Sequence, residues 1–182
     1  MKQTERLFIA AELPENMVRT LKHTAHSLGL RGKARLSRPE NYHVTLAFLG
    51  ETELARAEQI ERAVSRAVEN VPPVSAALSG LGYFGKKNDA VLWCGLAGAQ
   101  PLIALAERIR KNLGQAGIWF DGKPVRPHIT LARRADLTGI SLEGASPAPA
   151  AGTLSNITLF ESVREAGRLV YRPLRRFYLK DV

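Results

Sequence analysis

The stretches His43-Val44-Thr45-Leu46 and His128-Ile129-Thr130-Leu131 repeat one pattern, His-x-Thr-Leu, in opposite halves of the chain. In an extended strand, residues i and i+2 point to the same face. Each copy therefore places one imidazole and one hydroxyl on one side, and two apolar side chains on the other. If the two strands come together, the two histidines face each other across a shared cleft. The repeat thus predicts a fold with two lobes and one site between them.

The residue types in this pattern are suited to acid–base chemistry on an anionic substrate. An imidazole titrates near neutral pH, so one histidine can accept a proton while the other donates one. For an in-line displacement at phosphorus, the two groups must stand on opposite sides of the phosphorus atom. The threonine hydroxyls can donate hydrogen bonds to the non-bridging oxygens, whose charge needs stabilising. Two of the four histidines of the chain lie in the pattern, and this chemistry requires neither a metal nor a cofactor.

The rest of the chain alternates strand and helix signals without a flexible linker. Strands are predicted at residues 6–13, 34–36, 42–49, 74–83, 89–96, 128–132, 154–163 and 169–180. Helices are predicted at residues 14–28, at 53–70 with Thr52 as the cap, and from Pro101 to about Leu113. Residues 139–152, rich in Ala, Pro, Ser and Gly, are predicted to form a loop.

This order predicts one α+β domain over residues 1–182. We expect two pseudo-symmetric lobes of mostly antiparallel sheet, with helices on the outer faces and a central cleft.

Composition narrows the possible partners. The chain has 182 residues and a net charge of +9, from 26 Lys and Arg against 17 Asp and Glu. This balance favours a polyanion: nucleic acid, an anionic membrane surface or phosphorylated metabolites. No apolar run is long enough to span a bilayer, so no membrane association is expected. Cys94 is the only cysteine; we expect it to be buried and the protein to be cytoplasmic.

Four segments resemble a known family: RLFIAAELP (6–14), NYHVTLAFLG (41–50), RPHITLAR (126–133) and YRPL (171–174). With the repeated motif, they resemble the two-histidine phosphoesterase superfamily. Within it the chain is similar to the bacterial and archaeal RNA 2′,3′-cyclic phosphodiesterases, also called 2′-5′ RNA ligases.

The resemblance implies metal-independent opening of an RNA terminal 2′,3′-cyclic phosphate to a 2′-phosphomonoester. In that reaction His43 is the proton donor to the leaving 3′ oxygen and His128 the acceptor from water, although the symmetry of the motifs allows the reverse. Thr45 and Thr130 bind the phosphate. Reversible 2′-5′ RNA ligation is implied as a minor activity, with an RNA 5′-hydroxyl in place of water.

Arg133 matches an arginine of the family pattern and is expected to bind substrate. It lies five residues after His128, an odd offset that turns it away from the cleft in a regular strand. To reach phosphate it must lie beyond the strand end or come after a bulge; otherwise it is a surface arginine. Phe48 has the corresponding place after His43, where we expect a core residue rather than one that stacks on a base.

Two groups of residues have less defined roles. His23 and His26 share a helix face, but nothing in the sequence completes a set of metal ligands. Nine basic residues form either a rim for RNA or solvated strand faces: Arg31, Lys33, Arg35, Arg38, Arg164, Arg168, Arg172, Arg175 and Arg176.

Three functions are therefore compared. The leading one acts on RNA ends. The second acts on a small cyclic phosphate of the ADP-ribose 1″,2″-cyclic phosphate type, and the third is a non-catalytic RNA-binding module. The expected partners are RNA ends or small cyclic nucleotides, and the expected state is a monomer.

Overall fold

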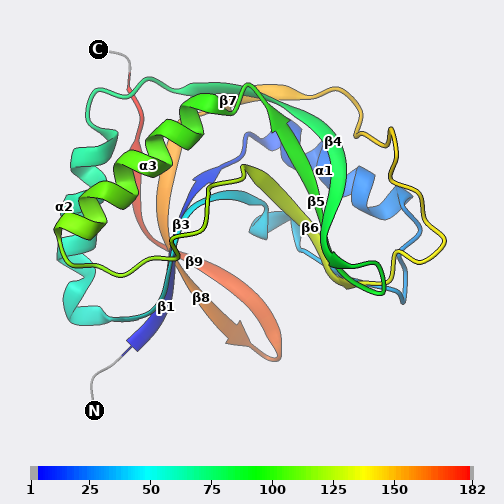
Figure 1. Cartoon of the computed structure of the whole chain (residues 1–182), viewed down its shortest axis with the longest axis horizontal. Coiled ribbons are helices and arrows are strands. Elements are labelled where there is room, and N and C mark those ends of the chain that lie inside the picture. Colours follow the sequence, from blue (N-terminus) through cyan, green and yellow to red (C-terminus); the bar gives the residue numbers. More distant parts are fainter. Residues whose placement is uncertain (1–3, 181–182) are drawn as a thin grey trace.

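The computed structural model describes residues 4–180, so the two ends of the domain predicted over residues 1–182 lie outside the described residues. Within this range the chain forms two antiparallel sheets and three α-helices (Figure 1). The strands are β1 (Thr4–Glu12), β2 (Arg35–Leu36), β3 (His43–Glu53), β4 (Val74–Lys86), β5 (Asp89–Ala97), β6 (His128–Ala135), β7 (Ala151–Leu154), β8 (Asn156–Glu165) and β9 (Arg168–Tyr178). The helices are α1 (Glu15–Ser27), α2 (Ala57–Val68) and α3 (Gln100–Gln115), with 3₁₀ turns at Pro39–Asn41 and Leu54–Arg56.

Each sheet carries one copy of the motif near its inner edge. The first sheet has the strand order β3-β1-β8-β9 and the second has the order β2-β6-β5-β4-β7. Strand β1 is buried from Leu7 to Ala11, as expected for a strand covered on both faces. Strands β3 and β6, which begin with the two motif histidines, meet at the centre of the molecule (Figure 1). The predicted α+β fold with two antiparallel lobes is confirmed.

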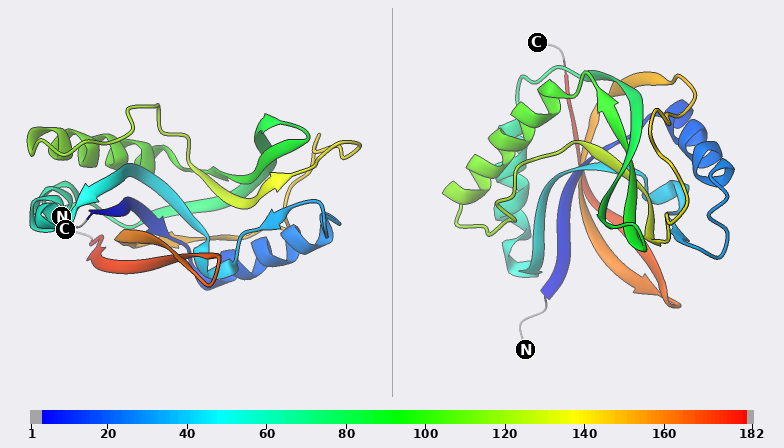
Figure 2. Two further views of the ribbon diagram at one scale, coloured as in Figure 1. Left: turned by 90° about the horizontal axis from the view of Figure 1, so that it is seen from below. Right: turned by 45° about the vertical axis from the view of Figure 1, so that its right-hand side comes forward.

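Helices α1 and α3 each pack on the sheet that does not contain the strand before them. Helix α1 follows β1 of the first sheet but packs on β6 and β7 of the second, whereas α3 follows β5 of the second sheet but packs on β3 of the first. Helix α2 packs between α3 and β9. Figure 2 shows α1 on one side of the molecule and the α2–α3 pair at the opposite end. Buried residues from both sheets and all three helices form one core cluster.

The predicted loop at 139–152 is wrong at its end, where β7 begins. Strand β7 pairs with β4 in the second sheet, and the chain then crosses at Ser155 into β8 of the first sheet. The single strand predicted at 154–163 is therefore two strands. Most residues of β7 are small, so the sequence lacks the larger apolar residues that predict a strand. At Gly152 the neighbouring space is already filled, because an added Cβ would lie 2.6 Å from Cγ of Pro14.

The predicted start of the second helix is also wrong. Strand β3 continues through Thr52 to Glu53, and α2 begins only after the 3₁₀ turn that comes next. The Thr52 hydroxyl donates to the carbonyls of Leu49 and Gly50, at 3.2 and 3.3 Å, and so cannot cap the helix.

Candidate active site

Both motif histidines are oriented by the same backbone contact. Nδ1 of His43 lies 2.7 Å from the carbonyl oxygen of Asn41, and Nδ1 of His128 lies 2.6 Å from that of Arg126. Because a carbonyl oxygen only accepts, Nδ1 of each neutral ring carries the proton. In each ring Nε2 is then the nitrogen left to exchange a proton with a substrate. The two lobes thus present equivalent imidazoles.

A β-bulge in β6 brings Arg133 to the cleft. Consecutive residues of β5 pair with Thr130 and Ala132, which leaves Leu131 as an extra residue. The bulge reverses the alternation of side chains, and both Leu131 and Ala132 are fully buried. Arg133 consequently lies on the same side as Thr130. Arg133 was expected to reach phosphate either from beyond the strand end or after a bulge, and the structure shows the bulge.

The same bulge occurs in β3. Consecutive residues of β1 pair with Thr45 and Ala47, leaving Leu46 as the extra residue. Phe48 therefore takes the place in the first lobe that Arg133 takes in the second. It is half-buried, lines the cleft and lies under the guanidinium of Arg6, 5.0 Å from the ring centroid. The expectation of a core phenylalanine is wrong because the bulge at Leu46 turns Phe48 toward the cleft.

Burial controls the charge of both histidines. It lowers the pKa of His43 to about 4; the Asn41 carbonyl opposes this shift, and the charges of Arg133 and His128 add to it. The pKa of His128 is lowered as well, first by burial and then by Arg133, against the effect of the Arg126 carbonyl. Both rings are therefore uncharged at neutral pH in the free protein.

The neutral state of His43 also fits its contact with the motif threonine. Nε2 of His43 lies 3.0 Å from Oγ1 of Thr45. Since Nδ1 carries the proton, Nε2 accepts the hydrogen bond that the hydroxyl donates.

Aromatic rings enclose each imidazole. Around His43, the centroids of Phe8 and Tyr171 lie 4.9 and 5.2 Å from the imidazole. Phe84 meets His128 edge-on at 5.0 Å, and Trp93 lies 6.3 Å away. These rings explain why burial is the largest cause of both pKa shifts.

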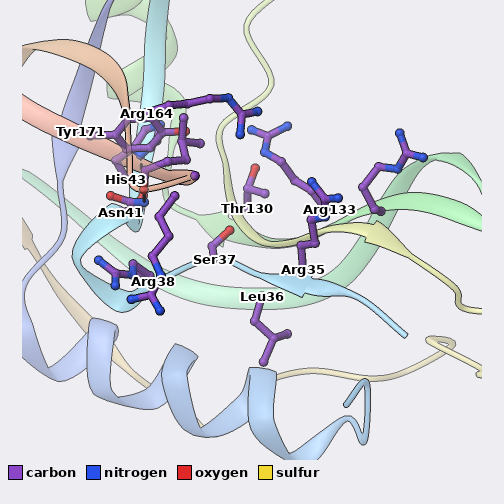
Figure 3. Close-up of a pocket in the computed structure, with 14 residues that line it drawn as sticks. Arg35, Leu36, Ser37, Arg38, Asn41, His43, Thr130, Arg133, Arg164 and Tyr171 are labelled. Carbon is purple, nitrogen blue, oxygen red and sulfur yellow. Dashed lines mark hydrogen bonds between the residues drawn. The ribbon is translucent and has the colours of Figure 1, made fainter. Parts of the chain in front are cut away.

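Three adjoining cavities meet at the histidines, and each sequence-predicted site residue lines at least one. The arginine arm, of about 550 Å³, includes His43, Thr130 and Arg133 (Figure 3). The mixed arm, of about 580 Å³, includes His43, Thr45 and Arg133. The aromatic arm, of about 380 Å³, includes Thr45 and His128. The fold therefore gathers all five residues around one branched cleft.

Sequence reasoning missed Arg110, which joins the first motif strand to the loop that leads to the second. From α3, its Nε donates to the carbonyl of Leu46 at 3.0 Å, and its Nη1 donates to the carbonyl of Lys123 at 2.6 Å. Leu46 is the bulge residue of β3, and Lys123 belongs to the loop that leads to His128. The guanidinium thus fixes both motifs to one helix. On a helix an arginine of this kind resembles a solvated residue, and no sequence signal distinguishes it.

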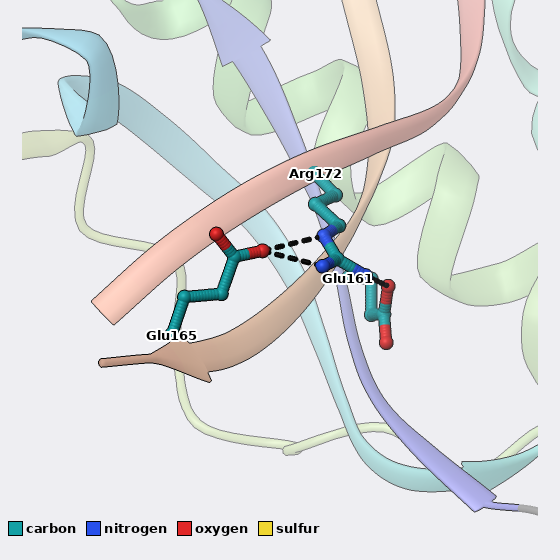
Figure 4. A network of polar contacts seen from close by, with 3 residues as sticks. All are labelled: Glu161, Glu165 and Arg172. Carbon is teal, nitrogen blue, oxygen red and sulfur yellow. Dashed lines mark hydrogen bonds and ion pairs between the residues drawn. The ribbon is translucent and has the colours of Figure 1, made fainter. Parts of the chain in front are cut away.

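The nine basic residues separate into three groups. Arg35, Arg38, Arg164 and Arg168 line the arginine arm. Three later arginines of β9 are instead paired with carboxylates, Arg175 with Glu61 at 3.8 Å and Arg176 with Glu12 at 2.8 Å. Arg172 lies between Glu161 and Glu165 (Figure 4). Arg31 and Lys33 are exposed outside the arm.

The remaining candidates lie away from the cleft. His23 and His26 are on the exposed face of α1, and residues 4–180 contain no group of three or more His, Cys, Asp or Glu placed to hold a metal ion. Cys94 is fully buried, as expected, and burial raises the pKa of its thiol to about 11. No helix in the described part of the chain has the length and apolar character to cross a bilayer.

Two antiparallel sheets that bring a pair of His-x-Thr strands to one cleft define the class of two-histidine phosphoesterases. Within that class, the chain belongs to the 2′-5′ RNA ligase superfamily, whose family model matches residues 11–165.

Individual relatives agree with this placement. An RNA 2′,3′-cyclic phosphodiesterase of Escherichia coli is 30% identical over 183 residues, covering 98% of this chain and 99% of the relative. One of Thermotoga maritima is 35% identical over 130 residues, covering 70% and 69% of the two chains. The crystal structure of E. coli LigT complexed with 3′-AMP superposes with a TM-score of 0.85 at 27% identity, covering 97% and 99% of the two chains.

Proposed function

We propose that this protein hydrolyses the terminal 2′,3′-cyclic phosphate of RNA to a 2′-phosphomonoester. One observation carries the proposal: two imidazoles with the same backbone contact present Nε2 to one cleft from opposite lobes. The relatives named RNA 2′,3′-cyclic phosphodiesterase support the choice of substrate.

The reaction assigns a separate task to each histidine. Neutral His128 takes a proton from water, and the resulting hydroxide forms a new P–O bond. The bond from phosphorus to the 3′ oxygen breaks on the opposite side, and His43 gives that oxygen a proton. Thr45, Thr130 and Arg133 donate hydrogen bonds to the non-bridging oxygens as negative charge accumulates there. No step requires a metal ion.

The pKa of His43 limits when it can donate. In the free protein a pKa of about 4 leaves this imidazole unprotonated at neutral pH. A bound phosphodiester brings a negative charge that favours the protonated imidazole and raises its pKa. Substrate binding is therefore part of the activation of the acid.

Ligation, oligomeric state and location are further parts of the proposal. An RNA 5′-hydroxyl that replaces water in the cleft would form a 2′-5′ linkage, because the same proton transfers apply. A monomer is sufficient, since both histidines come from one chain. The single buried thiol of Cys94 fits a cytoplasmic protein.

The test is turnover in EDTA of an oligoribonucleotide that ends in a 2′,3′-cyclic phosphate, with the product isomer identified by NMR. We expect a 2′-phosphate from the wild type, and loss of turnover in His43→Ala and in His128→Ala. His23→Ala is the matched control, because it removes an exposed histidine of α1, and it should keep full activity.

Other results would select the alternatives. Turnover of ADP-ribose 1″,2″-cyclic phosphate without turnover of RNA would favour a small-molecule phosphodiesterase. RNA binding that weakens in the histidine variants, without turnover by the wild type, would favour a binding module. Loss of wild-type turnover in EDTA, restored by a divalent metal, would contradict the metal-independent mechanism.

A further inference from the structure

The three arms of the cleft differ in charge. Six arginines line the arginine arm together with His43 and Thr130, and its lining includes no acidic residue. The mixed arm includes the carboxylates of Glu5, Glu51 and Glu161, and the aromatic arm includes that of Asp121. Of these three arms, only the arginine arm has charged residues of one sign, all of them arginines.

The positive charge of this arm is largely uncompensated. Within residues 4–180, Arg134 pairs with Asp89 at 3.0 Å. No carboxylate of these residues lies within ion-pair distance of the other five: Arg35, Arg38, Arg133, Arg164 and Arg168. Arg172, Arg175 and Arg176 of β9, by contrast, are paired with glutamates. Like charges that gather in a cleft repel one another and focus a positive potential, which an anion relieves.

The five unpaired arginines come from both lobes. Arg35 in β2 and Arg133 in β6 belong to the second sheet, whereas Arg38 lies immediately before the 3₁₀ turn that leads into β3. Arg164 and Arg168 come from the β8–β9 hairpin of the first sheet. Figure 3 shows Arg164 extending from the side of His43 and Tyr171 toward Arg133 on the other side. A channel with arginines on both sides fits a linear polyanion, because their forked donors match phosphate oxygens.

The hairpin contacts the residue that orients His43. The side-chain amide of Asn41 donates to the carbonyl of Leu169 at 3.1 Å, while its own backbone carbonyl accepts from His43. The position of the hairpin arginines is thus linked to that of the imidazole.

The order of the reaction indicates which RNA segment lies here. In an in-line displacement the leaving 3′ oxygen and its ribose stand on the side of the acid, and water enters on the side of the base. His43 lines the arginine arm and the mixed arm, whereas His128 lines the aromatic arm, and of the two arms beside His43 only the arginine arm lacks carboxylates. The ribose, and the chain attached to its 5′ oxygen, therefore leave the reacting phosphate toward the arginines.

We propose that the arginine arm binds the backbone phosphates on the 5′ side of the reacting phosphate, so that the protein selects oligoribonucleotide ends over mononucleotides. This inference rests on the proposed function, because it uses the direction of that reaction. The neighbouring hydroxyls of Ser37 and Tyr171, which also line the arm, add neutral hydrogen-bond donors that suit phosphate or ribose oxygens.

Binding tests this inference without turnover. The probe is a fluorescent oligoribonucleotide with a linear 3′-phosphate, followed by anisotropy over a series of KCl concentrations, with unlabelled uridine 3′-phosphate as competitor. The variants are Arg38→Gln, in the connection between β2 and β3, and Arg168→Gln, in the β8–β9 hairpin. Arg175→Gln is the control, because it removes the same charge at an exposed arginine that pairs with Glu61.

We expect each arm variant to weaken oligoribonucleotide binding about fivefold to tenfold and to lower the salt slope by about 0.7. Affinity for uridine 3′-phosphate should stay within about twofold, as should oligoribonucleotide binding by the control. Thermal melting of each variant checks that it is folded.

Three results would overturn the inference: arm variants that bind the oligoribonucleotide as tightly as the wild type, equal weakening for the mononucleotide, or equal weakening in Arg175→Gln. Failure of the proposed function looks different. A protein that binds RNA through the arm but does not open the cyclic phosphate would contradict that function and leave the arm assigned.

Discussion

The His43 lobe and the His128 lobe present the same motif in the same way, but each places a different side chain beside it. In both lobes a carbonyl two residues earlier orients the imidazole, and a bulge at the motif leucine turns a later side chain back into the cleft. That side chain is Phe48 in one lobe and Arg133 in the other. The chemistry of the site is thus nearly symmetric, while its binding surface is polar on one side and aromatic on the other.

The surroundings of the histidines differ too. His43 lies near Phe8, Tyr171 and Phe160, and its pKa falls to about 4. His128 lies instead near Phe84 and Trp93, so a fold that repeats one motif twice can still surround its two copies with different side chains.

The largest effect on activity should come from removing either the acid or the base. With RNA, His43→Ala and His128→Ala should each lower kcat by about 10³-fold. With an aryl phosphodiester whose leaving group needs no proton, His43→Ala should regain most of the activity and His128→Ala should not. Measurement of kcat for both variants on both substrates checks this. Recovery in His128→Ala instead would exchange the two roles.

The next largest effect on activity should come from replacing Arg133, which takes the place in the second lobe that Phe48 takes in the first. Arg133→Gln should lower kcat/KM about 10²-fold, because a donor to the phosphoryl oxygens is lost. It should also move the alkaline limb of the pH profile upward, since the Arg133 charge lowers the pKa of both histidines. A pH series of kcat/KM for the wild type and for Arg133→Gln tests this. An unmoved limb would show that Arg133 does not act on the imidazoles.

The link between the lobes can be weakened with a smaller effect. Arg110→Ala should lower kcat about tenfold with little change in KM, because the motif strands lose their common anchor and the histidines lose alignment. The matched control is Arg108→Ala on the same helix, whose guanidinium donates to the carbonyls of Arg66 and Glu69 rather than to a motif strand. Equal losses in both variants would indicate general damage to α3.

The smallest effect concerns pH. Both histidine pKa values lie below the ordinary 6.5, so each ring loses its proton in more acidic solution than usual. The form with one protonated and one neutral ring is then most populated below pH 6.5, where kcat/KM should reach its maximum. The bound phosphate raises both pKa values, so the kcat maximum should lie at higher pH. Coinciding maxima would contradict this role of the substrate.

Sequence predicts the features that the motif itself encodes and misses those that tertiary contacts decide. The alternation in the two His-x-Thr-Leu stretches is sufficient to predict their strands and a shared cleft. The bulges leave a faint signal, the adjacent apolar pairs Leu46-Ala47 and Leu131-Ala132, which an alternating pattern does not contain.

Other features have no local signal. Strand β7 pairs through its backbone, and Gly152 within it is small because Pro14 fills the space beside it. Arg110 acts through two distant carbonyls, so only the folded chain reveals its contacts. The same applies to the separation of the basic residues into paired and unpaired groups.

The exchange of helices between the lobes has a consequence for folding. Neither half of the chain contains a complete lobe: the first sheet joins β1 and β3 to β8 and β9 from the other end of the chain, and α1 and α3 each pack on the sheet that lacks their preceding strand. Each half expressed alone would expose an apolar sheet face and should aggregate rather than form a stable lobe. The lobes should therefore unfold in one cooperative transition, and the chain should fold slowly for its size because its decisive contacts are distant in sequence.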